Sequence, residues 1–306
     1  MCIVADSVAD ISKTKIACFH IGCRLNNNTN VVLSQLVVYS ANVDSIADNN
    51  ALILPVYNPG NNYKNIIPLD FSNFPDFFDQ IDAYFSRWFP EQKSKSYTNS
   101  TNLGGDQDFL PVHQVGDYKF SIMPSKMDFN KIDRNILRIN PLAKIAIDSH
   151  SNDYSFIVYQ FFQKGHIDIT PFAYVCKPYD KDSMIIPTIH GHPHPSNIFN
   201  GFDRTNHYHP ISGTEFEQTA DFDHEIYCIS NNSNAKNITR KKDLDDFDHI
   251  IKKITTDYMN RKIRIYAPKS FIPGKIKIKG DKPNRNLFVK QTKYDFLNDL
   301  VIDKNF

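Results

Sequence analysis

Residues 74–89 read FPDFFDQIDAYFSRWF and carry a clear helical pattern. Pro75 and Asp76 suit the first turn of a helix, and Pro90 ends it. The pattern therefore predicts an amphipathic helix that covers one face of a sheet, and its aromatic stripe is typical of a core rather than of a cofactor site. The apolar residues at helical spacing are Phe74, Phe77, Phe78, Ile81, Phe85 and Trp88.

A second helix is predicted over residues 243–260. Aspartates gather at its start, and Arg261 and Lys262 follow its end, which suits the helix dipole at both ends. Its apolar stripe consists of Leu244, Phe247, Ile251, Ile254 and Tyr258. A third helical region, over residues 131–147, is expected to break near Pro141.

The other regular segments are short apolar or alternating runs bounded by turn residues, which predict β-strands. The first four runs suggest an antiparallel meander. The sequence therefore predicts an α+β fold, mainly antiparallel sheet with the two helices at 74–89 and 243–260. The predicted strands are 1–5, 15–21, 31–40, 51–57, 118–123, 154–162, 172–176, 184–186, 222–228, 263–266 and 275–279.

The length of 306 residues allows one large or two modest domains. We expect a single α+β unit spanning 1–306. An alternative subdivision places N-terminal strands and a helix in 1–90 and a histidine-rich sheet region in 110–306, joined by the polar loop 91–109. A hydrophobic content of 41% is enough for a packed core and argues against global disorder.

Charge and composition narrow the expected partners. The net charge of +1 argues against a strongly basic nucleic-acid binder, and no run is long and apolar enough to predict a membrane span. The five cysteines are odd in number and irregularly spaced, which favours a reducing compartment. We therefore expect a cytoplasmic protein with a small-molecule or protein partner, and neither a membrane nor a nucleic acid. Its Asn- and Lys-rich composition resembles that of proteins from amoebae or from the giant DNA viruses that infect them, which would place it in the host cytoplasm.

Six of the eleven histidines lie in residues 183–228. His190, His192 and His194 alternate with other residues after an apolar strand, and in an extended backbone residues two apart share one face. His224 follows in the predicted strand 222–228, with Glu225 beside it. His207 and His209 lie in the polar stretch between the two strands.

Neutral imidazoles are common ligands of zinc and other divalent transition metals, and a catalytic zinc needs about three protein ligands and one open position. The stretch therefore predicts a metal site held by His190, His192, His194 and His224, with Glu225 as the general base of a metal-dependent hydrolase. A metal-free pocket and an ordinary solvated loop are the alternatives.

Cys2 is the second catalytic candidate. If Met1 is removed, the free amine of Cys2 can act as the base for its own thiol. Cys2 together with Asn42 and Asp44 resembles the start of N-terminal-nucleophile hydrolases of the choloylglycine type, although Ala41 stands where that family has arginine. The resemblance covers about the first 60 residues and implies an amide hydrolase with Cys2 as the nucleophile.

Three functions are thus open: the metal-dependent hydrolase, the N-terminal-cysteine amide hydrolase, and a non-catalytic binding or scaffold protein, of viral origin if the compositional resemblance holds. A Walker loop, a dinucleotide-binding glycine pattern and a kinase signature are all missing from the sequence, so no nucleotide cofactor is expected.

Overall fold

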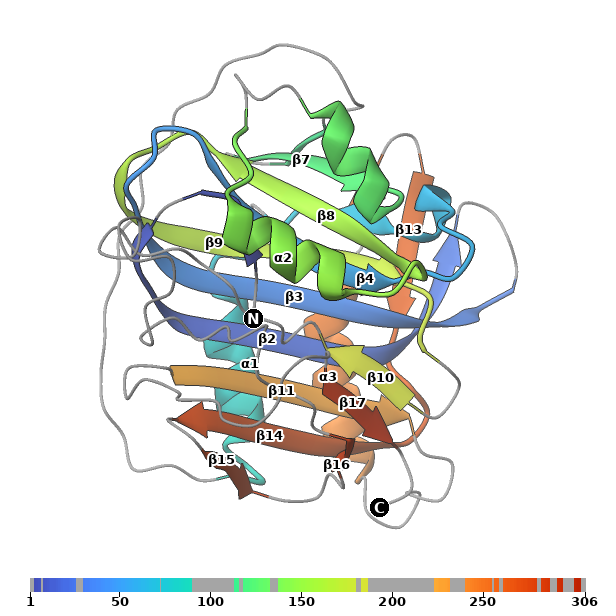
Figure 1. Ribbon diagram of the computed structural model, residues 1–306. Coiled ribbons are helices and arrows are strands. Elements are labelled where there is room, and N and C mark those ends of the chain that lie inside the picture. Colours follow the sequence, from blue (N-terminus) through green and yellow to red (C-terminus); the bar gives the residue numbers. More distant parts are fainter. Residues whose placement is uncertain are drawn as a thin grey trace.

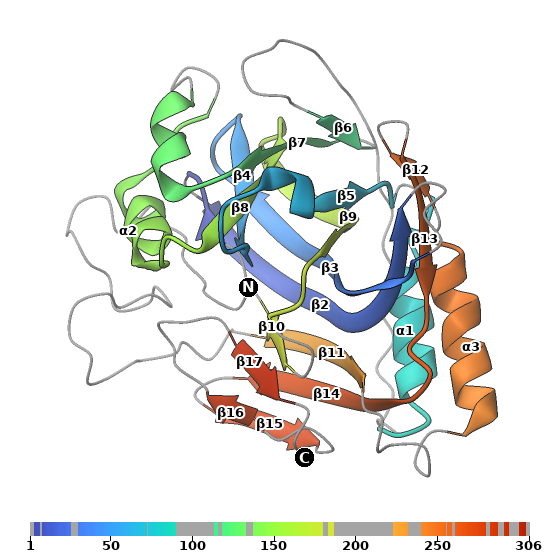
Figure 2. The same ribbon diagram turned by 90° about the vertical axis from the view of Figure 1, so that its right-hand side faces the viewer.

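The computed structural model describes residues 3–6, 8–25, 30–71, 73–89, 113–115, 118–132, 137–179, 183–186, 223–231, 240–254, 256–258, 261–279, 282–286, 291–293 and 300–303. These residues form stacked layers, in which two helices cover one face of a large sheet and a second sheet covers the other face (Figures 1 and 2). A third helix lies outside the second sheet.

The large sheet has the strand order β15-β14-β11-β2-β3-β9-β5, and β13 pairs with the C-terminal part of β2 and with β12. All pairs are antiparallel except β11 with β2. Its strands are β2 (Val8–Leu25), β3 (Val32–Ser45), β5 (Ile67–Leu69), β9 (Gly165–Cys176), β11 (Asp223–Asn231), β12 (Thr256–Tyr258), β13 (Arg261–Tyr266), β14 (Phe271–Lys279) and β15 (Lys282–Asn286).

Two smaller antiparallel sheets complete the strand content. The first has the order β1-β4-β8-β7-β6 and the second β10-β17-β16. Their strands are β1 (Ile3–Val4), β4 (Asn50–Tyr57), β6 (His113–Val115), β7 (Tyr118–Met123), β8 (Tyr154–Phe161), β10 (Ser183–Ile186), β16 (Gln291–Lys293) and β17 (Leu300–Asp303). The predicted α+β class with mainly antiparallel sheet is therefore confirmed.

The helices are α1 (Phe77–Phe85), α2 (Pro141–Ser149) and α3 (Lys241–Lys252), with short 3-10 turns η1 (Tyr63–Asn65) and η2 (Lys126–Lys131). α1 and α3 pack on the large sheet as their stripes predict, and α2 packs on the five-stranded sheet. The stripe residues that the sequence placed in the core are buried: Phe77, Phe78, Ile81, Phe85, Phe247, Ile251 and Ile254.

The helix ends differ from the prediction, and α1 spans Phe77–Phe85 instead of 74–89. α3 stops at Lys252 instead of 260, because Thr256–Tyr258 pairs with β13 as a hairpin, so Tyr258 belongs to a strand. Pro141 begins α2 instead of breaking a helix. The Asn140 side chain accepts a hydrogen bond from the backbone N–H of Ala143 and so caps the first turn. Proline is tolerated at this position because the backbone N–H groups of the first turn have no partner within the helix.

The predicted four-strand meander is wrong. β2 and β3 form an antiparallel pair in the large sheet, but β1 and β4 pair with each other in the five-stranded sheet. The four runs are thus divided between two sheets, and each sheet covers an apolar face of the other. Tyr39 and Phe172 of the large sheet meet Tyr159 of β8 in this interlayer core.

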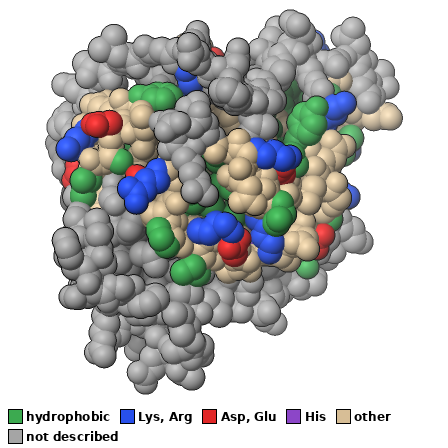
Figure 3. All heavy atoms as spheres, turned by 45° about the horizontal axis from the view of Figure 1, so that its top comes forward, with side chains coloured by type: hydrophobic (Ala, Val, Ile, Leu, Met, Phe, Trp, Pro, Cys, Tyr) green, Lys and Arg blue, Asp and Glu red, His purple; other side chains and the backbone are tan. Residues whose placement is uncertain are grey.

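Within the described residues, no helix combines the length and the apolar character that a membrane crossing requires. The face that Figure 3 shows carries Lys and Arg side chains interspersed with hydrophobic and uncharged ones, as far as the described residues extend.

Candidate functional site

Most of the predicted site residues lie outside the described part of the chain: His190, His192, His194, His207, His209 and Cys2. His224 lies on β11, where its backbone is in register with Thr14 of β2 and Ile278 of β14; its side chain also lies outside the described residues. β10 and β11, the strands expected to flank the metal site, belong to different sheets.

The metal site therefore stays a prediction. Among the described residues no group of three or more His, Cys, Asp or Glu side chains is arranged to hold a metal ion, and the six histidine side chains of 183–228 lie outside those residues. The roles assigned to Cys2 and to zinc, or to another divalent transition metal, are likewise open.

One pair of measurements tests both catalytic hypotheses. If residues 183–228 hold zinc, protein purified without a histidine tag contains about one equivalent of metal, and His192→Ala loses it while Cys2→Ser keeps it. If Cys2 is the nucleophile, intact mass shows loss of Met1 and Cys2→Ser abolishes amide hydrolysis without changing metal content. Metal-free protein that retains Met1 would contradict both hypotheses.

Glu225, the predicted general base, belongs to a polar cluster at the border between α1 and the large sheet. The Tyr227 hydroxyl lies 2.8 Å from Glu225 Oε2 and 2.9 Å from Asp82 Oδ1 of α1. Lys275 Nζ donates to Asp82 Oδ1 at 2.8 Å and lies 4.0 Å from Glu225 Oε1 and 4.9 Å from the centre of the Tyr227 ring. The Glu225 carboxylate is thus already engaged by two neighbouring groups.

Lys275 supplies the positive charge of this cluster, and Asp82 and Glu225 supply its two carboxylates. Partial burial acts to raise the pKa of Asp82, but the hydrogen bond and charge of Lys275 and the hydrogen bond from Tyr227 outweigh it and lower the pKa below its usual value. Burial, with the charges of Glu225 and Asp82, raises the pKa of Tyr227, so its hydroxyl keeps its proton. These four groups form a structural ion-pair network between helix and sheet.

The described cysteines are buried and reduced. Burial raises the pKa of the Cys176 thiol to about 12 and that of Cys23 to about 11. It also raises the pKa values of Cys18 and Cys228, which are neighbours on β2 and β11. Because the thiolate is the reactive form, these four are poor nucleophiles, unlike a thiol at an open N-terminus.

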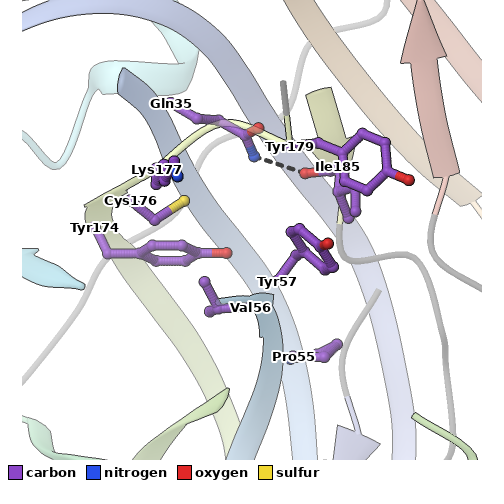
Figure 4. A pocket seen from close by; sticks show the side chains of 9 residues that line it. All are labelled: Gln35, Pro55, Val56, Tyr57, Tyr174, Cys176, Lys177, Tyr179 and Ile185. Carbon is purple, nitrogen blue, oxygen red and sulfur yellow. Dashed lines mark hydrogen bonds between the residues drawn. The ribbon is translucent and has the colours of Figure 1, made fainter. Parts of the chain in front are cut away.

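A solvent-open cleft lies where β4, the end of β9 and β10 meet (Figure 4). We call it the tyrosine cleft; it is lined by the nine residues that Figure 4 labels, and Tyr57, Tyr174 and Tyr179 supply its rings. Gln35 closes one side by donating from Nε2 to the backbone oxygen of Ile185 at 2.6 Å. The cleft has about 240 Å³ of space, including space open to solvent.

Ring contacts hold the tyrosines of this cleft. The centroid of the Tyr57 ring lies 4.9 Å from that of Tyr179 and 5.6 Å from that of Tyr154, both edge-to-face. Tyr179 is 44% exposed, whereas Tyr174 is buried. Burial, with the nearby charge of Asp153, raises the pKa of Tyr57, so its hydroxyl stays neutral at physiological pH.

Sequence reasoning missed the tyrosine cleft because its residues come from four separate stretches of the chain. Tyr57 and Tyr174 lie in or at the ends of predicted strands, where an aromatic residue is expected in any sheet. The only local signal is Pro178 beside the exposed Tyr179, and this signal is no different from an ordinary turn.

No family model matches the chain. Among solved structures it is similar to baculovirus P35, at 12% sequence identity and a TM-score of 0.38, with 96% of this chain and 85% of that chain covered. It is also similar to a mutated baculovirus P35 after caspase cleavage, at 11% identity and a TM-score of 0.40, with 95% and 99% covered. TM-scores this low assign the chain neither to a fold family nor to an activity.

Proposed function

We propose that the chain is a non-catalytic protein that binds a segment of another protein at the tyrosine cleft. The observation that carries the proposal is the edge-to-face pair of Tyr57 and Tyr179 at a depression that is partly open to solvent. Tyrosine is enriched among the residues that dominate binding energy at protein interfaces, because its ring offers a large contact area with few rotatable bonds.

The tyrosines are ordered before any partner arrives, which supports this role. Tyr57 is held between Tyr154 and Tyr179, and the tether from Gln35 to Ile185 fixes β10 beside them. A partner therefore meets a surface whose side chains have already lost much of their rotational freedom, and preorganisation of this kind improves affinity.

The size of the cleft argues against a bound cofactor. Much of its 240 Å³ is open to solvent, and the space comparable with a cavity volume is about 10 Å³, far below the roughly 300–1,000 Å³ of typical small-molecule sites. In addition, Glu225 would have to break its hydrogen bond with Tyr227 before it could act as a base. Its carboxylate therefore already has a structural role. Both observations support binding rather than turnover.

We expect the purified chain to select peptides from a displayed random heptapeptide library through these tyrosines. Tyr57→Ala and Tyr179→Ala should each weaken the best selected peptide by about 30-fold, the effect of losing an interface hot spot. Fluorescence anisotropy with the labelled peptide measures this. Tyr63→Ala is the matched control, since Tyr63 is 49% exposed but does not line the cleft. Peptides that bind all three variants equally well would show that the cleft is not the binding site.

A further inference from the structure

The tyrosine cleft carries one charged side chain. Lys177 follows β9 of the large sheet and is the one lining residue of the cleft with a full charge. It is exposed, and among the described residues no carboxylate forms an ion pair with it. Asp153, which precedes β8 of the five-stranded sheet, does not line the cleft.

From Lys177 and the neighbouring rings we infer that the tyrosine cleft selects segments in which an apolar side chain lies next to an acidic side chain, with the acid paired to Lys177. The inference rests on the proposed function and names the chemistry of the partner segment. The apolar anchor contacts the tyrosine rings, while Lys177 attracts a carboxylate on one wall.

One further feature fits an acidic neighbour beside Lys177. Tyr57 lines the cleft and keeps its proton, so its hydroxyl can donate a hydrogen bond to a carboxylate. The ammonium of Lys177 adds the opposite charge, which favours an acid over a basic residue at this place.

The test compares peptide pools selected on the full-length protein and on charge variants. On the unaltered chain, Asp and Glu should be enriched within two positions of the apolar anchor. On Lys177→Glu this enrichment should disappear and Lys or Arg should take its place. Lys164→Glu is the matched control, because Lys164 is an exposed lysine that does not line the cleft, and its pool should match that of the unaltered chain.

A double-mutant cycle on the best peptide tests whether its acid pairs with Lys177. Replacing its acid by the matching amide should weaken binding to the unaltered chain about two- to fivefold, as for an exposed ion pair, and should leave binding to Lys177→Ala unchanged. Tyrosine-dependent peptides without an acidic preference, or a preference that survives Lys177→Glu, would overturn this inference and leave the proposed function standing. A library that yields no tyrosine-dependent peptide would overturn both.

Discussion

Phe247→Ala is expected to lower the free energy of unfolding by about 3–5 kcal/mol, the cost of truncating a fully buried aromatic side chain. Phe247 of α3 is 0% exposed. Its ring lies 5.2 Å from that of Phe19 on β2 and 5.7 Å from that of Tyr84 on α1, measured between centroids. A third neighbour, Phe271, is 5.5 Å away on β14. The side chain thus joins both helices to two strands of the large sheet, and no single neighbour can move to fill the space.

Urea denaturation followed by circular dichroism measures this loss. The matched control is Phe162→Ala, since Phe162 is 42% exposed and its removal should cost less than about 1 kcal/mol. Equal losses in the two variants would mean that the helix layer is not packed on the sheet as the structure describes.

The second large effect is expected when both carboxylates of the Lys275 cluster are neutralised. Asp82→Asn combined with Glu225→Gln removes two carboxylates from around the Lys275 ammonium, whose side chain is 4% exposed. Removing the partner of a buried charge is far more costly than the net value of the pair, and we expect a loss of about 3 kcal/mol. Lys275→Met should cost less, because the Asp82 carboxylate that it leaves behind can reach water.

The pH dependence of stability checks the origin of this effect. The pKa of Asp82 is lowered in the folded state from its ordinary value of 3.8. The ionised carboxylate therefore stabilises the fold at neutral pH, and this contribution disappears as the pH falls through 3.8 and then through the lower folded value. Between pH 7 and pH 3 the Asp82→Asn variant should lose less stability than the unaltered chain. An identical loss would mean that Lys275 does not hold Asp82 in its ionised form.

The helical stripes were predictable because they depend on local spacing. The aromatic residues of 74–89 and the apolar residues near Phe247 repeat at the helical period, and that repeat alone identifies the face that is buried. The end of α3 was not predictable in this way. Residues 256–258 leave the helical path only because β13 offers them a strand partner, which is a tertiary effect.

Strand positions were largely predictable, but strand partners were not. Val37 and Leu52 both belong to apolar runs, and nothing in either run says that they lie in different sheets. The tyrosine cleft could not be predicted for the same reason, since Tyr57 and Tyr179 come into contact only when the two sheets have been stacked. Glu225 was predicted as a general base because it lies beside His224, and that role stays a prediction. Its neighbours in the fold, Asp82 and Lys275, could not be predicted because they are more than 40 residues away in sequence on either side.

The parallel pairing of β11 with β2 has a consequence for the order of synthesis. β2 ends at Leu25, whereas β11 spans Asp223–Asn231, so about 200 residues separate the two partners. At a synthesis rate of roughly 5–20 residues per second, the β11 side of β2 waits about 10–40 s on the ribosome before its partner exists. During that interval the nascent chain presents the open edge of an 18-residue strand, a surface that promotes pairing with other chains. Yield in the cell should therefore depend on chaperone capacity more than the stability of the finished fold would suggest.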